Sequence, residues 1–213
     1  MAMTYTILTG DKDTEGSIKY FVRHSIVPSD QILTSAQSLI YSMLRVREMK
    51  VLDTGTISTG VSELTLPTDF MEPVSFWLGG DNKLEIDIFD EQHFEERVGR
   101  DSSDVPYAGT PTECTMDRTK AYFNATTDAD YLYRLWYIAT PAALSGANET
   151  NFLTTRYPHI LEAMVKYYAY QHRQMANEAT TWLGIANAGI EKANGEYDLF
   201  RQAIRHEIHW GRS

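Results

Sequence analysis

The sequence predicts an α+β protein: a helical bundle formed by N- and C-terminal helices, with a β-rich insertion between them. Apolar residues recur at helical spacing near both ends of the chain. Between those zones the helical period is lost, and short β-rich runs are separated by Gly, Thr, Pro and Asp. Neither helical zone can easily bury its stripe alone, so the simplest arrangement packs the two together. We expect three segments, at residues 1–50, 51–140 and 141–213.

Two helices are predicted in the first segment. A short apolar stripe formed by Ile18, Phe21, Val22 and Ile26 indicates the first. The second begins after Pro28, where Ser29 or Asp30 can cap a periodic run. Its buried stripe is expected to contain Ile32, Ala36, Leu39, Ile40, Met43 and Leu44.

The middle segment contains the strand candidates, at residues 56–66, 73–78, 84–88, 120–124 and 131–138. A tight turn is expected at residues 79–82, because its glycines accept positive φ. The run 131–138 is apolar on both faces except for Arg134, which is typical of a central strand covered on both sides. Residues 90–98 predict a short helix capped by Asp90, and residues 99–112 predict an exposed loop.

The last segment begins with a linker at residues 141–151, after which the helical period returns. Pro158 suits the first turn of a helix. The stripe of that helix contains Ile160, Leu161, Met164, Val165 and Tyr168. A long final helix begins near residue 178, and we expect Asn194-Gly195 to interrupt it. Its stripe contains Ala186, Ile190, Ala193, Tyr197, Phe200, Ile204 and Ile208.

Composition and charge exclude several classes of protein. With 43 % hydrophobic and 23 % charged residues, the chain of 213 residues is not a wholly disordered protein or a collagen. Its net charge of −10, from 19 Lys and Arg against 29 Asp and Glu, disfavours wrapping nucleic acid. Nine acids against three bases lie in residues 81–104, and we expect them to be solvated. No signal peptide and no membrane span is evident, so we expect a soluble, intracellular-type protein.

No pattern of residues specifies a catalytic or metal site. His206 and His209 are spaced i, i+3 on the expected last helix, but Glu207 lies on the wrong face to be a third ligand. A solvated or partner-contacting tail is the better interpretation. Cys114, the only cysteine, has no neighbouring base in sequence and is expected to be structural, within a strand. Phosphate-loop, dinucleotide and nucleophile-elbow motifs are absent, and we expect no cofactor and no metal.

Tyrosines are concentrated on the helix that follows the linker. Tyr157, Tyr167, Tyr168 and Tyr170 cannot all face one core. Because Tyr and Trp are enriched at interfaces, some of these residues are expected to contact another subunit. The alternative is a tyrosine-rich rim around the core of a monomer.

Four pieces of local sequence then occur in a familiar order. A helix at residues 32–47 ends in Leu44-Arg-Val-Arg-Glu-Met, and Leu64-Thr-Leu-Pro-Thr-Asp-Phe70 opens the β-rich region. A strand is followed by Thr140-Pro-Ala-Ala-Leu144-Ser, and Asn151-Phe-Leu-Thr-Thr-Arg-Tyr-Pro158-His-Ile-Leu161 leads into the next helix, with Trp182 after it. In this order the chain resembles the head–tail adaptor (head completion, connector or neck) proteins of tailed bacteriophages.

The resemblance implies a structural protein without catalytic residues. Such adaptors form a ring, typically of twelve copies, below the portal protein, and support the tail or the next neck protein. The chain would be a virion component of the neck, made in the host cytoplasm, which helps to retain packaged DNA. The family's C-terminal segment often reaches the portal, and the docking residues expected here are Arg201, Arg205, His206, His209, Trp210 and Arg212. The ring contacts expected here are Tyr167, Tyr170 and Trp182.

Charge is compatible with this role, because an acidic ring would let DNA pass through its lumen without binding it. Two alternatives stay open. One is an adaptor with accessory cell-wall hydrolase activity, which would need Glu48 or Glu162 in a cleft beside a second carboxylate. The other is a different tail or baseplate subunit that ignores the portal.

Overall fold

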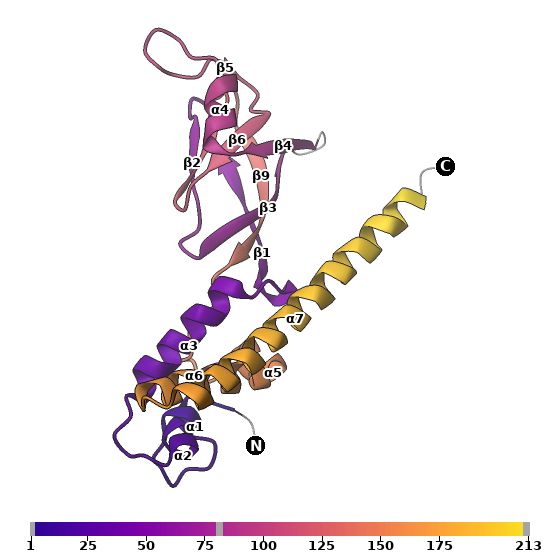
Figure 1. Cartoon of the computed structure of the whole chain (residues 1–213). Coiled ribbons are helices and arrows are strands. Elements are labelled where there is room, and N and C mark those ends of the chain that lie inside the picture. Colours follow the sequence, from indigo (N-terminus) through magenta and orange to yellow (C-terminus); the bar gives the residue numbers. More distant parts are fainter. Residues whose placement is uncertain (1–2, 80–82, 211–213) are drawn as a thin grey trace. The chain divides into compact units, whose positions relative to one another are not determined.

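The fold was described from a computed structural model. The structure describes residues 3–79 and 83–210, with side chains as far as residue 199. The chain divides into two compact units (Figure 1). The helical unit comprises residues 1–48 and 141–213, and the β unit comprises residues 49–140. The expected α+β class, with terminal helices around a β-rich insertion, is confirmed.

The helical unit brings together elements from both ends of the chain. Helix α6 packs against α3 and α7, and α2 also lies against α6 (Figure 1). This confirms the expected association of N- and C-terminal helices. The helices are α1 (Tyr5–Thr9), α2 (Ile18–Val22), α3 (Ser29–Met43), α5 (Phe152–Arg156), α6 (Pro158–His172) and α7 (Ala176–Trp210), and a 3-10 turn, η1 (Arg47–Met49), leads into the β unit.

Helix α3 follows the predicted pattern, with a wider buried face. Ile32, Ala36 and Ile40 are buried as expected, and Leu33 and Tyr41 join them. The expectation for Ile26 is wrong, because this side chain is 80 % exposed. Helix α2 ends at Val22, the following residue has a left-handed backbone, and Ile26 therefore falls in the connection to α3.

The linker before α5 is held by polar contacts from α3. Gln37 Oε1 accepts a hydrogen bond of 2.7 Å from the backbone N–H of Leu144. Asn151 donates to the Tyr41 hydroxyl at 2.9 Å, and burial raises the pKa of Tyr41 to about 12. Asn151 also begins α5 as half of a capping box with Thr154. The side chains that fix this segment are therefore polar, although no polar periodicity marks them in the sequence.

Helix α7 is continuous through Asn194-Gly195, so the expected interruption is wrong. The Asn194 side chain accepts a hydrogen bond of 2.7 Å from the backbone N–H of Arg45 and donates one of 3.0 Å to the Met43 carbonyl. Those two backbone groups lie at the C-terminal end of α3, where helical partners run out. Asn194 therefore joins α7 to the end of α3 instead of breaking α7.

The β unit contains a seven-stranded sheet in the order β1-β9-β3-β4-β6-β7-β2, antiparallel except for the parallel β4–β6 pair. A separate pair, β5 and β8, is parallel. The strands are β1 (Lys50–Ile57), β2 (Glu63–Thr65), β3 (Phe70–Leu78), β4 (Leu84–Phe89), β5 (Ala108–Gly109), β6 (Glu113–Met116), β7 (Lys120–Phe123), β8 (Thr126–Thr127) and β9 (Tyr131–Ala139).

Two expectations for the strands need correction. The single strand predicted at residues 56–66 is divided between β1 and β2, with Gly60 at φ +84° in the turn between them. Strand β9 is central, as predicted, because it pairs with both β1 and β3. Its second face is only partly covered, since Leu132 is 57 % exposed, whereas Ile138 on the same face is buried. The turn expected at residues 79–82 falls mostly outside the described residues.

The core of the β unit is built from aromatic and aliphatic residues on one face of the sheet. Phe76 is fully buried, with its ring 5.9 Å from that of Phe123 and 6.0 Å from that of Tyr133. Cys114 lies in this core on β6, as expected, and burial raises the pKa of its thiol to about 12. The short helix α4 (Glu91–Arg97) is capped by Asp90, which confirms the predicted cap.

Candidate functional surfaces

The charge of the chain is divided unequally between the two units. Residues 49–140 contain 17 of the 29 carboxylate side chains and seven of the 19 Lys and Arg residues. The β unit therefore carries the whole net charge of −10, and the helical unit carries equal numbers of acids and bases. A field of this sign repels phosphate and attracts basic protein surfaces.

The acids of residues 83–104 are exposed, as expected for solvated side chains. Several of them are paired locally: Asp90 with His93, and Glu95 with Arg100. Hydrogen bonds from the His93 backbone and ring hold the pKa of Asp90 below its usual value. Arg97 of α4 pairs with Glu113 of β6 and lowers the pKa of that carboxyl. The Arg97–Glu113 pair attaches α4 to the sheet, and the surface stays strongly acidic.

The three residues predicted to make ring contacts all lie in the helical unit and are partly buried there. The Tyr170 hydroxyl donates a hydrogen bond of 3.4 Å to the Phe21 carbonyl of α2. The Tyr167 ring lies 4.8 Å from that of Tyr168. Trp182 of α7 lies beneath the ammonium group of Lys166, at 4.1 Å from the ring centroid. Tyr170 and Trp182 therefore share one neighbourhood, and no contact described here joins Tyr167 to it.

Lys166 organises this neighbourhood. Its Nζ is 2.6 Å from Glu162 Oε1. The same Nζ lies 4.5 Å from the centroid of the ring of Phe21, a residue of α2. The Lys166 side chain is only 15 % exposed, so its charge is held between a carboxylate and two aromatic faces. Cation–π contacts of this kind contribute about 0.5–2 kcal/mol each, more when they are desolvated.

A pocket of about 580 Å³ opens beside this cluster, and we call it the Trp182 pocket. Its lining combines aromatic rings from α2, α6 and α7 with three cations and one carboxylate. The lining residues are Lys12, Asp13, Tyr20, Phe21, Arg23, Lys166, Tyr170 and Trp182.

A neighbouring pocket, of about 300 Å³, contains two carboxylates. Glu15 and Glu162 both line it, with Tyr20 and Phe21 on the wall shared with the Trp182 pocket. Glu162 is neutralised by Lys166 at 2.6 Å. Glu48, the other acid considered for hydrolysis, pairs with Arg156 instead of with a second acid.

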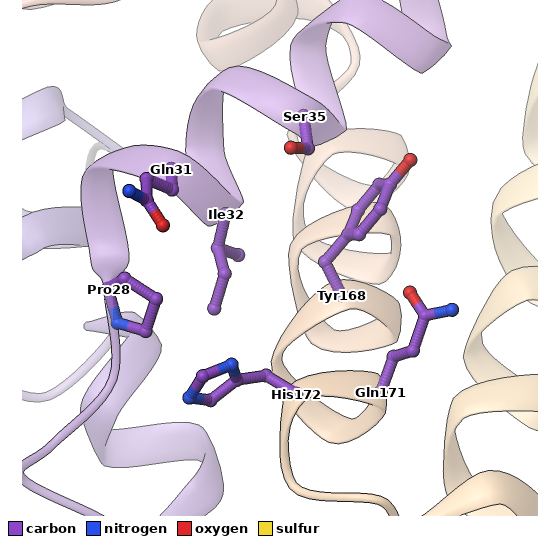
Figure 2. A pocket seen from close by; sticks show the side chains of 7 residues that line it. All are labelled: Pro28, Gln31, Ile32, Ser35, Tyr168, Gln171 and His172. Carbon is purple, nitrogen blue, oxygen red and sulfur yellow. The ribbon is translucent and has the colours of Figure 1, made fainter.

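A shallower groove, of about 250 Å³, lies between α3 and α6. Figure 2 shows Ile32 of α3 and His172 of α6 pointing toward one another across it. Gln31 and Gln171 add amide groups to its lining. The groove lacks the lysines and the arginine of the Trp182 pocket, and Tyr168 supplies its single phenol ring.

The expected portal-docking residues fall at the end of the described chain. Arg201, Arg205, His206, His209 and Trp210 belong to the backbone of α7, but their side chains lie outside the described residues. Arg212 lies outside them altogether. Within the described part of the chain, no group of three His, Cys, Asp or Glu side chains could hold a metal ion. None of the helices described is long and apolar enough to cross a bilayer.

A two-part fold, with helices from both ends of the chain and a β-rich insertion between them, is the architecture expected above from the sequence. The family model described as SU10 adaptor protein matches residues 12–209, which is nearly the whole chain. The protein therefore belongs to this family of phage head–tail adaptors, whose members are structural proteins of the virion. None of the curated proteins matches the chain.

Sequence reasoning missed one feature of these surfaces and found part of another. The Lys166 cluster joins α2, α6 and α7, and a single lysine before two tyrosines gives no sign of three-helix contact. The excess of acids at residues 81–104 was found, and counting acids and bases over the whole expected insertion extends it to the entire net charge. Both features contribute to the proposals below.

Proposed function

We propose that this protein forms a ring below the portal of a tailed phage, helps to retain the packaged DNA, and provides the platform for tail attachment. The observation that supports this most strongly is the match of the adaptor family model to residues 12–209. In this proposal twelve copies surround a lumen, one for each portal subunit. The protein acts by binding and not by catalysis.

The unequal charge of the two units supports passage of DNA through the proposed ring without binding. A ring whose β units each carry −10 presents no basic track for phosphate, so the genome can pass without being held. Portal docking is assigned to the end of α7, through Arg201, Arg205, His206, His209, Trp210 and Arg212. The acidic β unit is assigned to the tail or to the next neck protein, where it favours a basic partner.

The portal assignment is tested by truncation. The chain lacking residues 201–213 should lose co-elution with the portal ring of the same phage, whereas the full chain co-elutes. The matched control replaces only the basic side chains, by Arg201→Gln, Arg205→Gln and Arg212→Gln. Weakened binding that depends on salt is expected for this control. Full binding by the truncated chain would contradict the assignment.

A second candidate, an accessory cell-wall hydrolase, has one observation in its favour, because Glu15 and Glu162 line a common pocket. Glycoside hydrolysis needs one such carboxyl to be protonated. Glu162 is instead held in an ion pair with Lys166 at 2.6 Å, so we propose that the pocket is not catalytic. Release of soluble peptidoglycan fragments by the native chain, abolished by Glu162→Gln, would support the hydrolase.

A further inference from the structure

The Trp182 pocket has the properties of a binding site. Its volume of about 580 Å³ falls within the range of ligand pockets, about 300–1,000 Å³. Four of its lining residues are aromatic, and Tyr20 at its edge is 45 % exposed. Aromatic side chains that line a hollow and are partly open to solvent are typical of the anchor pockets of protein interfaces.

The charges around the pocket define what it can accept. Lys12, Arg23 and Lys166 line it. Lys12 pairs with Asp13 at 2.8 Å and Lys166 with Glu162 at 2.6 Å, so Arg23 is the lining cation that a further carboxylate would meet. An aliphatic or aromatic side chain would fill the space between the rings, and a carboxylate beside that side chain would meet Arg23. The pocket therefore fits an apolar anchor carried on an acidic segment of protein.

The chain itself contains such a segment in the same unit. Leu199 of α7 is 67 % exposed, the largest exposure among the leucines that the structure describes as exposed. Glu196 and Asp198 beside it are also exposed. Residues 191–199 contain three carboxylates and one lysine, so the segment is acidic, whereas the unit as a whole is neutral.

A copy of the protein cannot fill its own pocket with this leucine. Trp182 and Leu199 lie on the same continuous helix, 17 residues apart. At 1.5 Å per residue the helix separates them by roughly 25 Å. An anchor from this segment must therefore come from a second copy, and a contact between two different surfaces of identical chains repeats around a ring.

We infer that the Trp182 pocket of one copy receives Leu199 of the neighbouring copy, with Glu196 and Asp198 lying near Arg23 of the pocket. This deepens the proposed function, because it names the contact that would build the ring. It assigns Tyr170 and Trp182 to the receiving surface. It also explains why α7 exposes a leucine among acids beyond its last buried residues.

The contact between the two copies can be tested by disulfide cross-linking, and the portal is not needed for this experiment. The full-length chain carrying both Arg23→Cys and Leu199→Cys is oxidised at high concentration with copper phenanthroline and separated on a non-reducing gel. Native Cys114 is fully buried and should not compete. The inference predicts a ladder of dimers, trimers and higher species that collapses to monomer on reduction. Monomer alone, with both cysteines open to maleimide, would overturn it.

Matched variants exclude random collision and unfolding. Replacing Leu199→Cys by Leu132→Cys, at a leucine 57 % exposed in the β unit, should lose the ladder. The Leu199→Cys variant alone should give little dimer, and a yield equal to that of the pair would overturn the inference in favour of a symmetric contact. If circular dichroism shows that Arg23→Cys unfolds the chain, Tyr20→Cys takes its place, since Tyr20 lines the same pocket.

The failure of this inference is distinguishable from failure of the proposed function. If the chain binds the portal but never forms the ladder, the adaptor role is supported and the assigned ring contact is contradicted. If the chain forms the ladder but does not bind the portal, the contact is supported and the adaptor role is contradicted.

Discussion

The helical unit and the β unit differ in how their polar groups are used. In the helical unit acids and bases are equal in number, and a lysine held between aromatic rings lies beside an open pocket. In the β unit the core is built from aromatic and aliphatic side chains, and the acids are spread over an exposed surface. The difference indicates two kinds of interface: a shaped anchor site in one unit and a long-range electrostatic surface in the other.

The largest expected effect is on the stability of the β unit. Phe76→Ala removes a fully buried ring from between Phe123 and Tyr133 and should cost about 3–5 kcal/mol of unfolding free energy. Hydrogen exchange with peptide-level mass spectrometry, in increasing urea, would report each unit separately. Peptides from residues 49–140 should lose protection at lower urea, and peptides from α3 and α6 should not.

Ile160→Ala is the matched control in the helical unit, since Ile160 is buried in α6. It should reverse the pattern, lowering protection in the helices and sparing the β unit. Simultaneous loss in both units, for either variant, would show that they unfold as one cooperative body and would break the comparison.

The second largest expected effect is a loss of stability of the β unit at alkaline pH. Burial raises the pKa of Cys114 to about 12, and burial together with Asp53 raises that of Tyr133 to about 12. The stabilisation that depends on protonation of these two groups is complete at a pH below the pKa values they have in the unfolded chain. It is lost as the pH rises through the pKa values they have in the folded protein. For the thiol the loss between pH 9 and 12 is roughly 2–4 kcal/mol.

Urea titrations of the native chain and of Cys114→Ala, at a series of pH values from 8 to 12, would measure this loss. The slope of stability against pH above 9 should be shallower for the variant. Rapid reaction of Cys114 with a thiol reagent in the native protein at pH 8 would contradict the account, because a fully buried thiol is protected from it.

A smaller effect is expected where α7 joins the end of α3. Asn194→Ala leaves the Arg45 amide and the Met43 carbonyl without their side-chain partner. The expected cost is about 1–3 kcal/mol, measured by urea unfolding. Asn187→Ala, at an exposed position of the same helix, is the control and should change stability by less than about 0.5 kcal/mol. Equal effects of the two substitutions would show that the hydrogen bonds of Asn194 to the end of α3 do not stabilise the protein.

The last comparison is between two glycines, one of which gives the smallest expected effect. A Cβ on Gly55 of β1 would lie 2.8 Å from the Tyr133 ring, so Gly55→Ala should destabilise by about 1–3 kcal/mol. A Cβ on Gly184 of α7 would meet nothing within 4 Å, so Gly184→Ala should stabilise by about 0.5–1 kcal/mol. Thermal unfolding measures both, and the same sign for the two variants would show that these contacts do not decide the outcome.

How far the sequence predicts this molecule depends on the range of the interactions involved. The α+β class, the stripe of α3 and the Asp90 cap follow from local spacing, and all three are confirmed. Asn194-Gly195 was predicted to break a helix because local propensity omits the hydrogen bonds that Asn194 makes to α3. The exposure of β9 at Leu132 was missed because alternation cannot tell a covered apolar face from an exposed one.

The candidate sites were predictable to a smaller extent. Tyr170 and Trp182 were selected as interface residues from their type alone, and their role stays a prediction. The pocket they share depends on Lys166 and on α2, which lies about 150 residues away in sequence. Contacts over such separations are not encoded in any local pattern.

The central claim is that this chain assembles on a portal. The direct measurement mixes it with the portal ring of the same phage and determines the mass of the complex by size-exclusion chromatography with light scattering. The account predicts that the chain moves onto the portal peak, with a mass corresponding to one copy for each portal subunit. Separate elution of chain and portal, at both low and moderate salt, would contradict the account.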